Sequence, residues 1–317
     1  MQNLSNKIQD AAKKLLEEKK VDVVVGFEQG SLPLRSTPYF ARTPEEVANL
    51  IWNSGCENNL ANYLRKRSDK VAVVAKGCDV RSIVVLVKEN QINRDNLYII
   101  GIPCSGMIDQ NKVNAAVSGK EITEAAVNGD QVVIKGVGFE TTVALADMIH
   151  DYCNDCKYPN PVIFDELIGE KVTGKDVVSY AEVDEFEAKS PAERQAYLAA
   201  EMTKCIRCYA CRNACPMCYC SECFVDCNTP EWISKSVDVG DNLIFHAVRA
   251  LHLGGRCVDC GACTRACPMG VDIGKLTRKL AKDVKELFNY EAGVSLEEKC
   301  ALSTFTEGDS EDFLVKE

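Results

Sequence analysis

The sequence has no apolar run long enough to cross a membrane. Its longest apolar stretches are short pieces such as residues 83–87, whereas a membrane-spanning helix needs about eighteen or more apolar residues. The opening residues also lack the apolar stretch of a secretory signal peptide. We therefore expect a soluble, cytoplasmic protein with no membrane span.

Positively charged residues are also fewer than negatively charged ones. The chain has 37 Lys and Arg residues against 47 Asp and Glu residues, which gives a formal net charge of −10. Binding to nucleic acid depends on clustered Lys and Arg that neutralise phosphates. We therefore expect no nucleic-acid partner.

Cysteine, by contrast, is abundant, with eighteen residues in a chain of 317. A secreted scaffold held together by disulfides would be shorter and would begin with a signal peptide. We therefore expect the cysteines to be reduced and metal-bound, in an anaerobic cytoplasm.

One cysteine pattern occurs twice. The spacing C-x2-C-x2-C-x3-C-P begins at Cys205 and again at Cys257. In bacterial ferredoxins, three closely spaced thiolates hold one 4Fe–4S cluster and the fourth holds the neighbouring cluster. Zinc is the alternative, but it takes four ligands and needs no third cysteine at this interval. We predict two 4Fe–4S clusters with crosswise ligands, Cys205, Cys208, Cys211 and Cys267 at the first site and Cys215, Cys257, Cys260 and Cys263 at the second.

More cysteines follow the first copy, at Cys218, Cys220, Cys223 and Cys227. Their spacing matches no cluster-binding run, although four thiols so close together could still take a metal. We expect a structural or inert role for them. We also expect His246 and His252 to be surface or packing residues, since thiolates already fill both predicted sites.

The first half has the pattern of an α/β domain. Apolar residues at helical spacing predict a helix over residues 4–19. Short apolar, β-branched runs predict strands, and the segment Thr43-Pro44-Glu45-Glu46 predicts the start of a helix that continues through Trp52. The expected strands lie near residues 21–27, 70–76, 83–87 and 97–102.

A polar, acidic segment at residues 171–189 predicts a domain junction. We expect an α/β domain over residues 1–185. A dicluster ferredoxin-like domain with flanking helices, a long insert and an acidic tail at residues 307–317 should follow over residues 186–317. Within the second domain, the pattern predicts a helix launched by the capping box of Ser190, a helix capped by Asp241, and a helix over residues 273–288.

The order of motifs resembles a known family. Lys76-Gly77-Cys78 follows one predicted strand, Gly101-Ile102-Pro103-Cys104 follows another, and Cys153-x2-Cys156 precedes a turn with Asp165. This order, and the stretch Pro216-Met-Cys218-Tyr-Cys220, is similar to that of the beta subunits of hydrogenases and formate dehydrogenases that use the deazaflavin coenzyme F420. The similarity covers residues 20–170 loosely and residues 200–290 more closely.

The resemblance implies a subunit that carries iron–sulfur clusters and flavin, as FAD, and that passes electrons between other redox subunits and a soluble hydride carrier. Such subunits usually show a Gly-Gly turn suited to the flavin phosphates, where this chain has Gly55-Cys56-Glu57. A pyrophosphate beside the Glu57 carboxylate is electrostatically disfavoured. Gly136-Val137-Gly138 lacks the third glycine of a dinucleotide fingerprint and is expected to be a turn.

Four cysteines outside the ferredoxin-like repeat could form a third site. Residues at strand ends of an α/β sheet converge on one edge, and the resemblance points to the same residues. The alternative is buried free thiols with a zinc pair at the C-x2-C segment. We predict a third 4Fe–4S cluster held by Cys78, Cys104, Cys153 and Cys156.

Together these patterns predict an iron–sulfur electron-transfer subunit of a multi-subunit oxidoreductase complex, either a hydrogenase, a formate dehydrogenase or a complex like heterodisulfide reductase. Two other hypotheses stay open: a catalytic flavoprotein that itself reduces a deazaflavin or nicotinamide carrier, and a first half that is only an assembly platform. Flavin content separates the first of these from the electron-transfer subunit.

Overall fold

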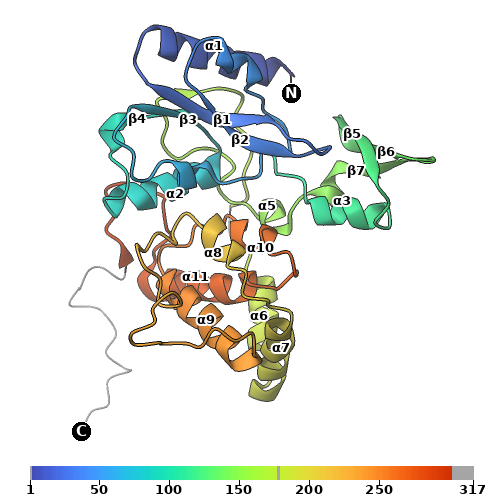
Figure 1. Ribbon diagram of the computed structural model, residues 1–317, viewed down its shortest axis with the longest axis vertical. Coiled ribbons are helices and arrows are strands. Elements are labelled where there is room, and N and C mark those ends of the chain that lie inside the picture. Colours follow the sequence, from blue (N-terminus) through green and yellow to red (C-terminus); the bar gives the residue numbers. More distant parts are fainter. Residues whose placement is uncertain (1, 177–178, 302–317) are drawn as a thin grey trace.

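A five-stranded sheet organises the first half of the computed structural model, which describes residues 2–176 and 179–301 (Figure 1). The strand order is β2-β1-β3-β4-β8, with β2 antiparallel to β1 and the remaining pairs parallel. The expected tail at residues 307–317 lies outside the described residues. The strands are β1 (Val23–Gln29), β2 (Ser36–Ala41), β3 (Val71–Ala75), β4 (Leu97–Gly101) and β8 (Glu166–Leu167).

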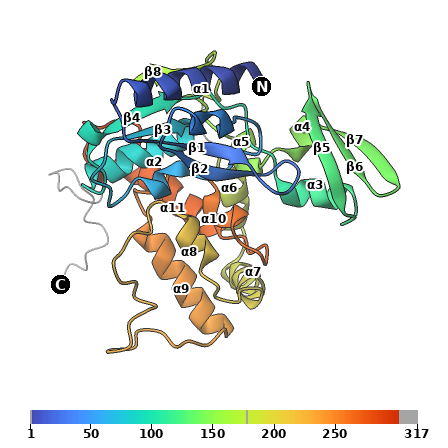
Figure 2. The ribbon, with the colours of Figure 1, turned by 45° about the horizontal axis from the view of Figure 1, so that its top comes forward.

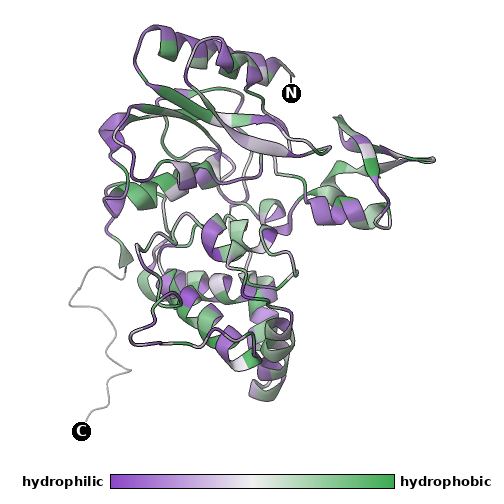
Figure 3. Ribbon diagram, in the orientation of Figure 1, coloured by the Kyte–Doolittle hydropathy of each residue, from purple (hydrophilic) through white to green (hydrophobic). Residues whose placement is uncertain are grey.

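Helices α1 (Gln2–Glu17) and α2 (Gly77–Lys88) cover opposite faces of this sheet, as Figures 1 and 2 both show. Strand β3 is buried along its whole length, as expected for a parallel strand covered on both faces. Figure 3 shows the same layering, with apolar strands inside and hydrophilic residues on the outer face of α1. The predicted mixed α/β class is confirmed, as are the helix at the start of the chain and the strands β1, β3 and β4.

One predicted strand is wrong, because residues 83–87 belong to α2. This helix is buried on nearly all sides, since it lies between the sheet and the second half of the chain. A short apolar run has no periodicity that separates a buried strand from a buried helix. The helix begins where the Asp79 carboxylate accepts a hydrogen bond from the backbone N–H of Lys76, at 3.2 Å.

The helix expected to run from Thr43 through Trp52 is also shorter than predicted. Thr43 and Glu46 form the predicted capping box, with Glu46 N–H donating to Thr43 Oγ1 at 3.4 Å and Thr43 N–H donating to the Glu46 carboxylate at 3.3 Å. Only a turn of 3-10 helix follows, η1 (Glu46–Asn49). The chain then becomes extended because the N–H of Ile51 bonds to the carbonyl of Phe27 in β1.

A second, antiparallel sheet of three strands projects from the first half and was not predicted (Figure 1). It has its own small core, which includes Val113, Val132 and Ile134. Gly136 and Gly138 lie at the turn between β6 and β7, where Gly138 has a φ of 76°, so the predicted turn is confirmed. The strands are β5 (Ile122–Asn128), β6 (Gln131–Gly136) and β7 (Phe139–Ala144).

Several short helices connect these strands. The N-terminal ends of some are fixed by side chains, as where Asn59 accepts a hydrogen bond from Ala61 N–H at 3.1 Å. They are η2 (Leu60–Tyr63), η3 (Arg94–Asn96), α3 (Gln110–Ala116), α4 (Leu145–Met148) and α5 (Asp151–Asn154).

The second half consists of helices and loops, with no strand among the described residues 179–301. The predicted capping box of Ser190 is confirmed, with Glu193 N–H donating to Ser190 Oγ. Helix α9 begins earlier than predicted, because Asp238 and not Asp241 is its cap. The helices are α6 (Ala181–Glu187), α7 (Pro191–Thr203), α8 (Ala210–Ala214), α9 (Val239–His252), α10 (Ala262–Arg265) and α11 (Gly274–Phe288).

Tyr152 of α5 fixes the first half against the second. Its hydroxyl lies 3.1 Å from Thr264 Oγ1, and its ring fills the space beside two glycines. A Cβ added at Gly261 would lie 2.9 Å from the ring of Tyr152, and one at Gly274 would lie 1.6 Å from its hydroxyl. Arg81 of α2 adds hydrogen bonds to the carbonyls of residues 258 and 292.

We expect Gly274→Ala to destabilise the protein by about 1–3 kcal/mol, the usual cost of forcing an extra methyl group into a packed site. The new Cβ would displace the Tyr152 hydroxyl and break its contact with Thr264. The measurement is the thermal unfolding midpoint under anaerobic conditions. Tyr152→Phe removes the clashing oxygen, so the double variant should be more stable than the sum of the single losses predicts. Additive losses would show that the clash is absent.

Candidate iron–sulfur sites

The two copies of the cysteine repeat share an unusual backbone. Arg207 and Tyr209 have φ values of 50° and 60°, and Asp259 and Gly261, at the equivalent positions of the second copy, have 55° and 67°. Side chains larger than glycine rarely adopt this left-handed region. Alternation between right-handed and left-handed residues turns successive N–H groups to one side, which forms a concavity for an anion and is found at iron–sulfur sites.

Backbone amides also reach the thiols in both copies. The N–H of Arg207 bonds to the sulfur of Cys205, and the N–H of Asp259 bonds to the sulfur of Cys257. Hydrogen bonds from amides favour the thiolate form of a cysteine. They are also among the factors that set the potential of a cluster.

The four cysteines of the predicted second site lie around one small cavity of about 20 Å³. Cys215 comes from the first copy of the repeat, at the end of α8, and joins three cysteines of the second copy. This is the crosswise combination that the spacing predicts. The cavity is lined by Cys215, Cys257, Cys260 and Cys263.

The cysteines of the predicted first site also lie near one another. Burial raises the pKa of Cys205, and the neighbouring thiols of Cys267 and Cys208 raise it further. Burial likewise raises the pKa of Cys211 to about 12, with added contributions from Cys205 and Cys267. Cys208 is the exposed member of the set.

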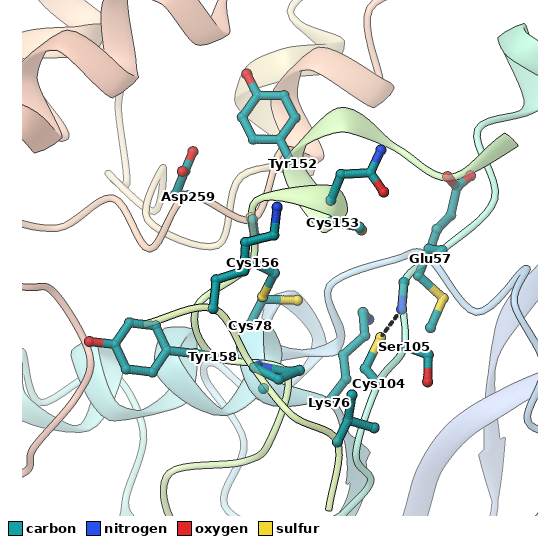
Figure 4. A pocket seen from close by; sticks show the side chains of 18 of the residues that line it. Glu57, Lys76, Cys78, Cys104, Ser105, Tyr152, Cys153, Cys156, Tyr158 and Asp259 are labelled. Atoms are coloured by element: carbon teal, nitrogen blue, oxygen red, sulfur yellow. Dashed lines mark hydrogen bonds between the residues drawn. The ribbon is translucent and has the colours of Figure 1, made fainter. Parts of the chain in front are cut away.

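The four cysteines of the predicted third site line one cavity of about 150 Å³ between the two halves (Figure 4). They come from three segments that are distant in sequence. Cys78 lies in the first turn of α2, Cys104 follows β4, and Cys153 and Cys156 lie in and after α5. Cys104 accepts a hydrogen bond from Gly106 N–H at 3.4 Å. The structure therefore brings together all four residues that the sequence singles out.

Buried cations surround the thiols of the third site. Lys76 is 2% exposed and is held by Asp79 at 2.9 Å. Burial raises the pKa of Cys104 to about 12, and the charge of Lys76 opposes this shift. Arg265 lines the same cavity and donates to the carbonyl of Cys260 at 2.6 Å. Thiols beside buried cations suit a cofactor that binds thiolates.

The three sites form a row. Cys260 of the second site also lines the cavity of the third site. The second site is also close to the first. Burial raises the pKa of Cys211 of the first site, and the thiol of Cys263 of the second site raises it further. No three His, Cys, Asp or Glu side chains within the described residues are close enough to share a single metal ion.

Arg249 of α9 lies between the first and second sites. Its side chain is 3% exposed, and one guanidinium nitrogen donates to the carbonyl of Cys211 at 3.1 Å. Burial lowers the pKa of Arg249, but the thiols of Cys263 and Cys215 raise it above its ordinary value. Within the described part of the chain it has no carboxylate partner, so the thiols provide its counter-charge.

His246 is buried, so of the two positions expected from the sequence, surface or packing, it has the second. Its Nε2 lies 3.4 Å from the sulfur of Cys205. Burial and the charges of Arg249 and Arg207 lower its pKa to about 4. The apolar pattern of this helix points to the opposite face, because Ile244 and Leu251 are exposed whereas His246 and Arg249 are buried.

The carboxylate of Glu57, which argued against a flavin phosphate, is not an isolated charge. It lies 3.1 Å from His150, 3.6 Å from Arg265 and 3.8 Å from Arg35. Burial acts to raise the pKa of Glu57, but His150 and the two arginines lower it below its ordinary value. These partners offset the charge of Glu57, so the carboxylate repels a flavin phosphate less than the sequence alone suggests.

The chain is 27% identical to an F420-dependent formate dehydrogenase subunit beta of Methanocaldococcus jannaschii, over 89% of this chain and 90% of the relative. It is 25% identical to the F420-dependent formate dehydrogenase 1 subunit beta of Methanococcus maripaludis, over 92% and 91%. The chain resembles the beta subunits of F420-dependent formate dehydrogenases. The resemblance expected from the motifs is thus confirmed.

A solved F420-reducing NiFe hydrogenase complex of Methanosarcina barkeri contains a chain that matches with a TM-score of 0.36 and 18% identity, over 47% of this chain and 57% of that one. No protein-family model matches the chain. Across residues 2–176 and 179–301, no helix is both long and apolar enough to span a membrane.

Proposed function

We propose that this beta-subunit-like chain is the iron–sulfur electron-transfer subunit of a cytoplasmic, anaerobic oxidoreductase complex, such as an F420-dependent formate dehydrogenase or hydrogenase. The observation that carries the proposal is the convergence of Cys78, Cys104, Cys153 and Cys156 on one cavity beside Cys260. Buried free thiols with a zinc pair would not need three distant segments to line one cavity.

The proposal assigns a 4Fe–4S cluster to each of the three sites and a ferredoxin-like domain to residues 186–317. One-electron transfer is the chemistry that such clusters supply when bound. The left-handed backbone at Arg207, Tyr209, Asp259 and Gly261 supports this assignment, because it turns amides toward the thiols. The chain's own contribution is to hold the thiolates, to surround them with buried cations and to align the three sites.

A catalytic flavoprotein is the second candidate. A polar cavity of about 390 Å³ lies beside residues 57–63 and includes Glu57 of the segment that the resemblance relates to FAD. Arg35 and Arg265 line it together with Glu57, whose charge they oppose. Flavin bound here would make the subunit the site of hydride transfer to the soluble carrier.

Iron, acid-labile sulfide and flavin per chain, measured in anaerobically purified protein, test both functions. We expect at least about twelve iron and about twelve sulfide atoms, the content of three clusters, and no flavin. Stoichiometric flavin released on denaturation would support the catalytic flavoprotein. Fewer than about twelve iron atoms in protein whose clusters are fully reconstituted would contradict three clusters.

Crosswise ligation has its own test. Cys267→Ser should damage the first site, whose other ligands lie more than about fifty residues earlier, and spare the second. Cys215→Ser is the matched variant and should do the reverse, since Cys215 shares a cavity with Cys260. Electron paramagnetic resonance of the reduced protein, with iron analysis, identifies the site that is lost. If Cys267→Ser instead removes the cluster of Cys257, Cys260 and Cys263, ligation is not crosswise.

A further inference from the structure

A cavity of about 490 Å³ lies against α9, next to the second site, with which it shares Met217 and Leu253 as lining residues. Three cysteines that the proposed clusters do not use, Cys218, Cys220 and Cys223, line it. All three are free thiols. Sequence spacing alone favours a structural or inert role for them, but the structure places all three on one cavity together with three arginines.

These cysteines belong to a long irregular segment. Residues 215–238 connect α8 to α9 without a helix or strand. A connection longer than about 12–15 residues with no regular structure is uncommon in a compact domain and usually has a function. Its later part is fixed by packing, since Val225 and Ile233 are buried and Arg207 donates to the carbonyls of Ser234 and Ser236. Residues 220–222, by contrast, are exposed.

The cavity is also lined by cations, as the third site is. Arg212, Arg249 and Arg256 face it together with the three thiols. Arg212 hydrogen bonds to the sulfur of Cys223 as well as to Asp226. Arg249 has no carboxylate partner among the described residues. Guanidinium groups of this kind stabilise the negative charge of a thiolate-bound cluster.

We propose that Cys218, Cys220 and Cys223 hold a fourth iron–sulfur cluster, with His252 as the fourth ligand. His252 lies at the end of α9 and lines the same cavity, whereas Cys227 does not. Among the described residues, no three His, Cys, Asp or Glu side chains are close enough to share one metal ion. A single tetrahedral zinc needs its ligands within one coordination sphere, whereas a multinuclear cluster takes them further apart. The inference goes beyond the proposed function and does not depend on crosswise ligation.

The first test needs no variant. Anaerobically purified wild-type protein with fully reconstituted clusters should contain about sixteen iron atoms per chain, against about twelve for three clusters. Cys220→Ser and Cys223→Ser should each lower iron by about four atoms and leave the reduced spectra of the other clusters unchanged. Ser221→Ala, on the same segment and lining the same cavity, is the matched control and should retain all the iron.

Unchanged iron in both serine variants would overturn the fourth cluster, as would loss of one zinc instead of iron. Cys156→Ala separates this result from failure of the proposed function, because that variant removes a different cluster. If Cys156→Ala lowers iron and Cys220→Ser does not, the three-cluster function stands and the fourth cluster is wrong. His252→Gln should alter the spectrum of the fourth cluster, and an unaltered spectrum would show that His252 is not its ligand.

Discussion

Cys156→Ala should lower the iron content by about four atoms per chain and abolish electron transfer across the subunit, while the two ferredoxin-like sites keep their clusters. Cys156 lines the third cavity together with Cys78 and Cys104. A cluster that loses one of its protein thiolates is expected to be unstable, and the third site is the end of the row that faces the first half. Its loss would therefore disconnect the other two sites from whatever binds there.

The measurement combines iron analysis, electron paramagnetic resonance of the reduced protein and the activity of the assembled complex. Cys56→Ala is the matched control. Cys56 is a buried thiol of the same half that does not line the cavity, so its replacement should leave iron and electron transfer unchanged. Unchanged iron in Cys156→Ala would exclude the third cluster.

Arg249→Met should lower the midpoint potentials of both ferredoxin-like clusters. Reduction adds negative charge, and Arg249 is the buried cation between the first and second sites. At an effective dielectric constant of about 20 and a separation of roughly 7 Å, one charge contributes about 2–3 kcal/mol, which corresponds to roughly 100 mV for one electron. The potentials are measured by redox titration followed by electron paramagnetic resonance.

Arg249→Lys is the control for this experiment, since it retains the positive charge while it loses the planar guanidinium. Its potentials should stay close to those of the wild type. A shift in one cluster alone would place Arg249 beside a single site, and no shift in either would show that its charge does not act on the clusters.

The sequence predicts which cysteines lie near one another better than it predicts the fold around them. Ligand spacing is local information, so the crosswise sets can be written from the positions of the cysteines alone. Cys78 and Cys104 could be related because both follow strands of one parallel sheet, whose carboxyl ends share an edge. Even so, the pattern predicts a strand at the nearby residues 83–87, because a helix buried on nearly all sides shows no clear amphipathic period.

What could not be predicted are the contacts between distant segments. Nothing in the spacing shows that Tyr152 fills the space beside Gly261 and Gly274, or that Arg265 reaches Glu57. The projecting three-stranded sheet has its own small core and follows from no motif. Such features depend on three-dimensional packing, to which local propensity contributes little.

Because Cys208 is exposed, the first site is the one of the three that is most accessible to oxidation. The remaining cysteines of the three sites are buried or partly buried, so dissolved oxygen reaches the first site before the others. Oxidation susceptibility follows exposure and thiolate character. Damage by air should therefore begin at Cys208 and proceed toward the third site, and a partner subunit that covers this surface would protect the whole row.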